Sequence, residues 1–209
     1  MFSDLSFNYL LVVIATMVIS ISLHEMMHSV AARLLGDTTA EDAGRLTLNP
    51  LKHIDLMLTI VLPAVLILLH LPPIFIAKPV PFDPRSVRYG EYGAALVGLA
   101  GPVTNLVLAI VGALAVRIGG IDMFSGVGQA AGIFIEINLL LCVFNLIPLP
   151  PLDGSRLLYA VAPEPLQRLM YQLETAGFAV TILLLLVLSP FISPIVSNVV
   201  SNLYAILMH

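Results

Sequence analysis

The feature that most constrains this chain is the stretch His24-Glu25-Met26-Met27-His28, which lies inside a long apolar run. Ionisable side chains at membrane depth are costly and usually mark function. Because positions i and i+4 of a helix share a face, His24 and His28 can present two imidazoles to one ion. Glu25 can then reach a water on that ion without being a ligand. The pattern predicts a catalytic zinc site; the alternative is a pair of interfacial histidines at a helix end.

The composition is that of an integral membrane protein. Hydrophobic residues make up 59% of the 209-residue chain and charged residues only 11%, whereas soluble domains carry about 25% charged residues. Several apolar runs approach the roughly 20 residues that span a bilayer, and the period-two alternation of a β-barrel is absent. The net charge of −4 and the lack of a basic block give no indication of nucleic acid as a partner. We expect one all-α polytopic membrane domain, residues 1–209, with its core at about 7–160 and accessory helices at about 165–208.

Five to six membrane helices are expected. The apolar runs predict long helices at about 7–35, 92–117, 127–147, 165–189 and 194–208, and a short amphipathic helix at 155–161. Residues 54–71 add an apolar run, and the prolines after it predict an extended segment at 74–82. Residues 44–48 also read as extended. These two extended segments could offer a strand edge to a substrate or could simply cover the site.

The topology follows from the second acidic candidate, Asp153, which comes just after the helix at 127–147. It can meet His24 and His28 only if that helix runs parallel to the first one. The helix at 92–117 supplies the one crossing this needs, so residues 54–82 should be re-entrant, a helix that enters and an extended segment that returns. Eight of the nine Lys and Arg residues then share one side, and only Arg117 lies on the other. This distribution predicts an outside N-terminus and a site nearer the cytosol.

A second motif, residues 145–154, can complete the metal site. A catalytic zinc usually has three protein ligands and one open position, and Asp153 offers an oxygen ligand on a proline-rich turn. Its alternative role is to cap the helix that starts near Ser155. Asn145 is a candidate donor to the oxyanion that forms during hydrolysis, with interhelical hydrogen bonding as its alternative. Glu136 is expected to line the cavity, with a place outside the hydrocarbon as its alternative, and Asn105 receives no role from the sequence.

The chain resembles the site-2 protease family of intramembrane zinc metalloproteases over roughly residues 10–160. His24-Glu25-x-x-His28 matches the H-E-x-x-H of that family, and residues 145–154 match its N-x-x-P-x-P-x-x-D-G signature. Gly101-Pro102-x-x-Asn105 matches a family motif in the intervening helix. Residues 44–50 and 77–81 resemble a compact prokaryotic subgroup that lacks a PDZ domain.

The resemblance implies a function and a set of roles. His24, His28 and Asp153 would bind one Zn²⁺ per chain, and Glu25 would be the general base. The reaction would be endoproteolysis of transmembrane substrates within or beside the lipid bilayer, as in regulated intramembrane proteolysis, in a prokaryotic cell (inner) membrane. A zinc-binding transporter and an inactive protease-like scaffold are the alternatives. A transporter often shows repeats, which this sequence lacks, and a purely structural zinc site has no need of Glu25.

Overall fold

The computed structural model describes residues 7–53, 61, 65 and 80–209. Every element in its described part is a helix, as predicted. These elements are α1 (Phe7–Leu34), α2 (Thr39–Asp42), the 3₁₀ helix η1 (Pro50–Lys52), α4 (Glu91–Gly119), α5 (Gly126–Asn145), α6 (Gly154–Val161), α7 (Glu164–Thr175) and α8 (Phe178–Met208).

Four of the described helices are long and apolar enough to cross a membrane: α1, α4, α5 and the Ile182–Met208 part of α8. The chain is therefore a multi-pass membrane protein. The expected re-entrant helix and most of the extended segment fall on residues 54–79, which lie almost entirely outside the described residues. The total of five to six membrane helices stays a prediction for the same reason.

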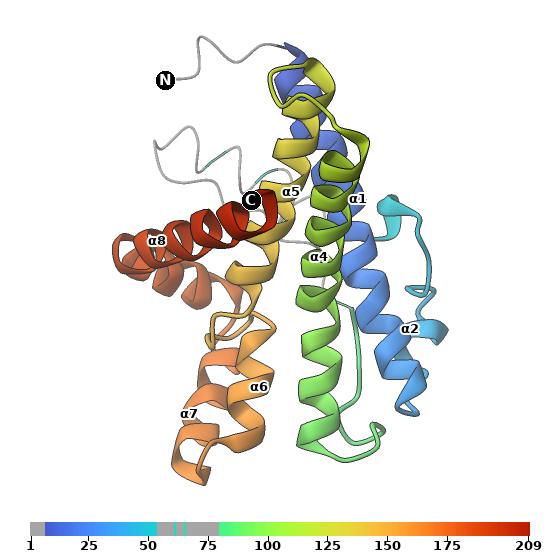
Figure 1. The fold of residues 1–209 in the computed structure, drawn as a ribbon. Helices are drawn as coiled ribbons and strands as arrows, with labels where there is room; N and C mark the ends of the chain where they lie inside the picture. Colours follow the sequence, from blue (N-terminus) through green and yellow to red (C-terminus); the bar gives the residue numbers. More distant parts are fainter. Residues whose placement is uncertain (1–6, 54–60, 62–64, 66–79) are drawn as a thin grey trace.

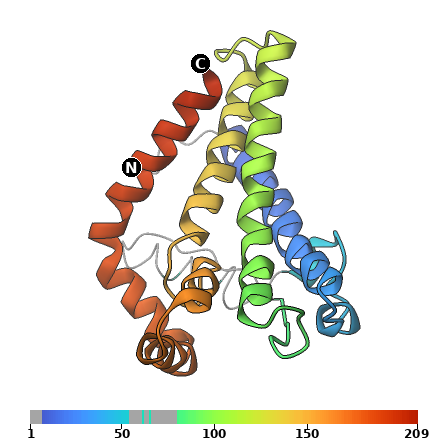
Figure 2. The same cartoon turned by 60° about the horizontal axis from the view of Figure 1, so that its bottom comes forward.

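Three helices form the centre of the fold, with α4 in contact with both α1 and α5 (Figure 1). The chain runs along α4 in the direction opposite to α1 and α5 (Figure 2). The C-terminal ends of α1 and α5 therefore lie at the same end of the bundle, which the topology argument required. Small side chains let the helices approach closely: Ala109 and Ala113 of α4 pack with Ile135 and Leu139 of α5 in the main buried cluster.

The chain also comes back to the end of α1 before α4 begins. The Asp37 carboxylate, just past α1, accepts a hydrogen bond from the Asp83 N–H at 2.8 Å. The Leu35 carbonyl accepts one from the Arg88 N–H, also at 2.8 Å. Residues 37 and 83 thus lie together at one end of the bundle. The path between them through residues 54–79 is outside the described residues.

Residues 44–48 are not extended as expected. They form turns and bends that lie along α1, where the Ser29 hydroxyl donates to the Arg45 carbonyl at 3.4 Å. The Arg45 guanidinium in turn donates to the Lys52 carbonyl. Hydrogen bonds thus join this loop to α1 and to η1.

The predicted division of the C-terminal part into helices 165–189 and 194–208 is wrong. The break lies earlier, at Gly177, whose φ of +96° ends the preceding helix in a conformation that suits glycine. Helix α8 then continues through Pro190 and Pro194. Prolines are tolerated inside membrane helices because neighbouring groups satisfy the backbone they free, so here they do not end the helix.

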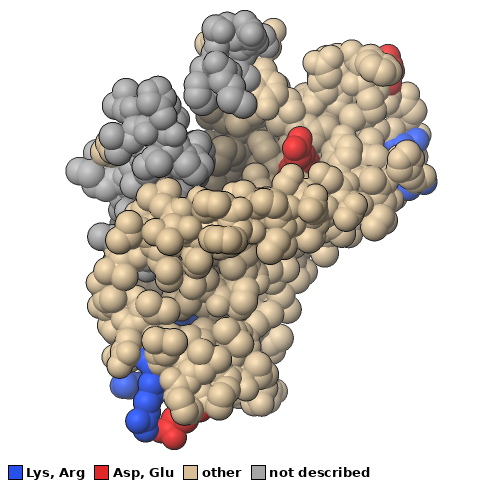
Figure 3. Space-filling view, turned by 90° about the vertical axis from the view of Figure 1, so that its left-hand side faces the viewer, with Lys and Arg blue, Asp and Glu red and all other residues tan. Residues whose placement is uncertain are grey.

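Figure 3 shows one face, on which charges gather toward the two ends and a broad uncharged area lies between them, interrupted by an acidic side chain. Glu136, in the middle of α5, is exposed. It therefore lies on the outside of the described helices and not among the buried polar groups described below.

Candidate metal centre

The structure brings the three predicted ligands together. His24 and His28 lie one turn apart on α1, and Asp153 lies at the start of α6. The Nε2 atom of His24 is 3.1 Å from Asp153 Oδ2, and that of His28 is 3.4 Å from Asp153 Oδ1. The two Nε2 atoms are 3.0 Å apart. Each residue thus offers one ligand atom to a common point, and the described residues contain no other such group of three.

The turn before α6 aims Asp153 at the histidines. Asp153 occupies the N-cap position of α6, but its side chain makes no capping hydrogen bond. The capping alternative is therefore not what the carboxylate does. The turn is tight, since a Cβ on Gly154 would lie 2.2 Å from the Leu146 carbonyl oxygen. Only a glycine fits directly after the aspartate.

The donor set fits a zinc ion. His28 Nδ1 lies 2.7 Å from the Val97 carbonyl, which can only accept, so His28 carries its proton on Nδ1 and turns a lone pair on Nε2 toward Asp153. Asp153 Oδ2 is buried and has no hydrogen-bond partner. Two ligand atoms each about 2.1 Å from a tetrahedral zinc lie about 3.4 Å apart, close to the separations found here. The geometry of the cluster can accommodate a zinc cation.

The charges around Asp153 also favour a bound cation. Burial alone would raise the pKa of its carboxyl group. Positive charge on the neighbouring imidazoles, that of His28 first, would lower that pKa by more, so the net shift is downward. Positive charge at this position stabilises the carboxylate, and a divalent metal ion would supply it with the imidazoles neutral.

On the side facing α4, the two imidazoles pack against helix backbone that carries no side chain. A Cβ on Gly101 of α4 would lie 2.5 Å from the Nε2 atoms of both His24 and His28. Contacts this short do not occur, so any side chain at position 101 would displace the imidazoles. The glycine of the Gly101-Pro102-x-x-Asn105 motif therefore makes room for the two ligand rings.

Glu25 is next to the ligands but not among them. Its side chain is buried, and the residue is 9% exposed. The Ser29 hydroxyl donates to the Glu25 backbone carbonyl, while no residue of the described part donates to its carboxylate. A buried carboxylate without a fixed partner beside a metal centre is free to accept a proton.

Asn145 does not join this group. Its Nδ2 donates to the Leu141 carbonyl at 2.9 Å, one turn back in α5. This bond lies within one helix, so the interhelical bond considered from the sequence is not the one formed. An amide has a second N–H, and the oxyanion role of Asn145 stays a prediction.

Two residues to which the sequence analysis assigned no role lie beside the proposed ligands. Asn105 is completely buried and its Oδ1 lies 2.6 Å from Nδ1 of His24. Asn138 of α5 is equally buried and bonds to Asn105 at 2.9 Å. The signal that could have found both is the cost of an amide side chain inside an apolar helix, which demands a partner.

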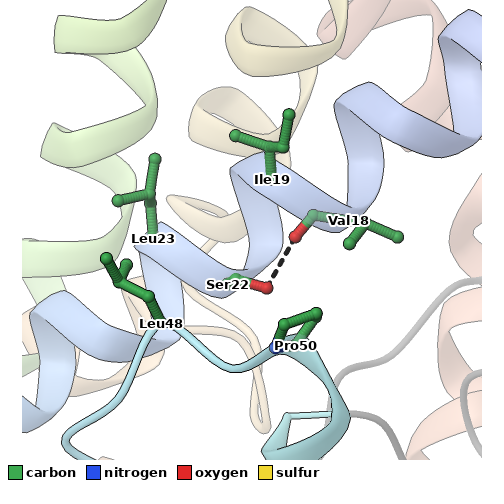
Figure 4. Close-up of a pocket in the computed structure, with 6 residues that line it drawn as sticks. All are labelled: Val18, Ile19, Ser22, Leu23, Leu48 and Pro50. Carbon is green, nitrogen blue, oxygen red and sulfur yellow. Dashed lines mark hydrogen bonds between the residues drawn. The ribbon is translucent and has the colours of Figure 1, made fainter.

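An apolar pocket of about 280 Å³ lies between α1 and the loop that carries Leu48 and Pro50 (Figure 4). It is lined by Val18, Ile19, Ser22, Leu23, Leu48 and Pro50. The Ser22 hydroxyl donates to the Val18 carbonyl at 2.6 Å, so this hydroxyl does not donate into the pocket. Because Ser22 is three residues before Glu25, the two share a side of α1, and the pocket lies about one turn from the carboxylate.

Comparisons with known proteins agree with this geometry. Residues 116–189 match peptidase family M50. The putative zinc metalloprotease YwhC of Bacillus subtilis is 37% identical over 178 residues, which cover 82% of this chain and 78% of that protein. The putative zinc metalloprotease Rip2 of Mycolicibacterium smegmatis is 32% identical over 188 residues, 84% of this chain and 67% of that protein. No solved structure shows a significant match.

Proposed function

Because this chain belongs to peptidase family M50 and is a zinc metalloprotease, we propose that it cleaves transmembrane protein substrates within or near the bilayer. In this proposal His24, His28 and Asp153 hold one Zn²⁺ and Glu25 is the general base. The observation that carries the proposal is the convergence of three ligand atoms from α1 and the turn after α5, beside a buried carboxylate to which no described residue donates a hydrogen bond.

The residues of the chain have distinct tasks in the reaction. When bound, zinc supplies Lewis acidity and an activated water nucleophile. Glu25 accepts the proton of the attacking water and delivers it to the amine that leaves. Asn145, at the end of α5, would use its second N–H to stabilise the oxyanion. The imidazoles of His24 and His28 stay neutral and keep their protons on the side away from the metal.

The substrate class follows from the surroundings of Glu25. The centre is framed by helices that are long and apolar enough to span a membrane, and the pocket on α1 has almost entirely apolar walls. These features support a substrate that places an apolar side chain near the scissile bond, as a transmembrane segment does. Such a segment must unwind locally, because all its amides are bonded within the helix.

The proposed setting is a prokaryotic inner membrane with the N-terminus outside and regulated intramembrane proteolysis as the biological role. The charge asymmetry of Lys and Arg supports this orientation. Arg33 lies in the last turn of α1, Arg88 precedes α4 and Arg156 lies in the first turn of α6, all at the end of the bundle where α1 and α5 end. This side would face the cytosol, from which water must reach Glu25.

The test is cleavage of single-span reporter proteins with apolar membrane segments by the full chain in liposomes. Glu25→Gln should lower the cleavage rate by about 10²- to 10⁴-fold while the bound zinc per chain is unchanged. Glu91→Gln is the matched control, because Glu91 lies exposed in the first turn of α4. Full activity of Glu25→Gln, or zinc flux into the liposomes without any cleavage, would refute the proposal.

A further inference from the structure

A chain of buried hydrogen bonds leads from His24 into two other helices. His24 Nδ1 of α1 lies 2.6 Å from Asn105 Oδ1 of α4. Asn105 Nδ2 donates to Asn138 Oδ1 of α5 at 2.9 Å. Asn138 Nδ2 donates to the Phe134 carbonyl at 2.8 Å. Both asparagines have no exposed surface, so water cannot replace any of these bonds.

The direction of this chain is determined at its far end. The Phe134 carbonyl only accepts, so Asn138 must turn its NH₂ group toward it. The Asn138 oxygen then faces Asn105 and accepts from the Asn105 NH₂ group. The Asn105 oxygen is left facing His24, and it too only accepts. His24 must therefore carry its proton on Nδ1, which leaves a lone pair on Nε2.

We propose that Asn105 and Asn138 are positioning residues that set the tautomer of His24, so that its Nε2 is a metal ligand. The proposal rests on the zinc site described above. It gives Asn138 a task in zinc binding although this residue does not touch a ligand. It also explains why Asn105 lies one turn beyond Gly101 on α4. The same helix then holds both the glycine against which the imidazoles pack and the hydrogen-bond partner of His24.

The role of Asn138 follows from what its loss would allow. Without it, Asn105 loses the acceptor for its NH₂ group and its amide can turn over. The NH₂ group would then face Nδ1 of His24 and require a lone pair there. The proton would move to Nε2, directly in the position of the metal. Changes to such supporting groups typically cost 10- to 100-fold in metal affinity.

The test measures zinc affinity by competition with a chelator, using the full chain in detergent. Asn105→Leu and Asn138→Leu should each weaken zinc binding by about 10- to 100-fold. Asn105→Asp should bind zinc almost as the wild type does, because a carboxylate oxygen still accepts from Nδ1–H. Thr104→Val is the matched control, since the Thr104 hydroxyl donates only to the Ala100 carbonyl of its own helix.

A second readout separates positioning from a merely structural role. Nitrogen-15 NMR of histidine-labelled, zinc-free protein reports which ring nitrogen carries the proton, and His24→Gln identifies the signal. The wild type and Thr104→Val should show His24 protonated on Nδ1, and both leucine variants should lose this preference. If the leucine variants do not fold, Asn105→Asp decides, and a proton on Nε2 in that variant overturns the proposal.

The failure of this proposal can be told apart from failure of the zinc site. Asp153→Ala should lose zinc binding whatever the asparagines do. If Asp153→Ala binds zinc like the wild type, the proposed ligand set is wrong. If Asp153→Ala loses zinc while both leucine variants keep the wild-type affinity and tautomer, the ligand set stands and the positioning role of Asn105 and Asn138 is refuted.

Discussion

Nε2 of His24 lies 3.1 Å from Oδ2 of Asp153, although one residue belongs to a membrane helix and the other to the turn after a different helix. Oδ2 is buried and makes no hydrogen bond. An unsatisfied buried oxygen is costly, so the folded chain places these two groups together at the expense of stability. The predictions below follow from this relationship and from the residues that surround it.

Zinc should stabilise the protein through Asp153. A ligand present at about a thousand times its dissociation constant adds about 4 kcal/mol to the free energy of unfolding. We expect added zinc to raise the melting temperature of the wild type, a chelator to lower it, and Asp153→Ala to respond to neither. Thermal unfolding in detergent measures this. Asp42→Ala, at an exposed position, should respond like the wild type, and a zinc response of Asp153→Ala equal to that of the wild type would contradict the prediction.

Gly101→Ala should remove zinc binding, because the added methyl group would lie 2.5 Å from both ligand nitrogens. The bound zinc per chain, measured on purified protein, should fall well below one. The control is Gly126→Ala, where a Cβ meets nothing within 4 Å and the zinc content should not change. An alanine at position 101 that retains zinc would mean that the rings can move aside without losing the metal.

The three proposed metal ligands could be predicted from the sequence, because each depends on one local pattern. The spacing of His24 and His28 determines their common face, and helix direction alone brings Asp153 to them. The link from Asn105 to Asn138 could not be predicted in the same way. It depends on how α4 and α5 are rotated against each other, which an apolar run with small residues does not specify. The same holds for Asn145, whose spacing allowed an interhelical bond that the structure replaces with one inside α5.

Asp37 should make stability depend on pH. Burial raises the pKa of its carboxyl group, but hydrogen bonds from Thr39 and from the Asp83 N–H lower it by more, so the net shift is downward. A group with a lowered folded pKa stabilises the fold above its unfolded value of about 3.9 and loses that contribution as the pH falls through the folded value. Asp37→Asn should therefore destabilise the protein by about 1–3 kcal/mol at pH 7.

The measurement compares the melting temperatures of wild type and Asp37→Asn between pH 7 and pH 3. The difference should shrink as the solution becomes more acidic, because the wild-type carboxylate becomes protonated. Asp42→Asn is the control, since Asp42 is exposed and accepts only from Thr38. A difference between wild type and Asp37→Asn that stays constant over this range would show that the Asp37 charge does not stabilise the link to Asp83.

Filling the apolar pocket should change substrate preference. Leu48 lines the pocket from the loop side and is 57% exposed, so Leu48→Trp can extend into the pocket without disturbing the helices. We expect cleavage of reporters with a large apolar residue near the scissile bond to slow more than cleavage of reporters with alanine there. The measurement is the ratio of kcat/KM for the two reporters.

Leu51→Trp is the matched control for the pocket. Leu51 is 76% exposed in η1 and does not line the cavity. It should leave the ratio of kcat/KM unchanged. Equal effects of the two tryptophan variants would assign the change to the loop as a whole and not to the pocket.

The length of α8 shows where sequence patterns mislead in membrane proteins. Pro190 and Pro194 would end a helix in water, and they predicted a break that does not exist. The true boundary is at Gly177, which follows the polar helix α7. In an apolar environment the cost of an open backbone outweighs the local preference of proline, so glycine and a change in polarity are the better markers of a helix end.

Helix α4 supplies none of the proposed ligands, yet its sequence bears on whether a related chain can bind the metal. Gly101 of α4 leaves room for the two imidazoles, and Asn105 in its proposed role sets which nitrogen His24 exposes, while the histidines, Glu25 and Asp153 are the proposed reactive groups. A homologous chain could therefore retain all four reactive residues and still be a pseudoenzyme, if a bulkier residue replaced the glycine of the middle helix. Inspection of that one position would separate active peptidases from such inactive copies.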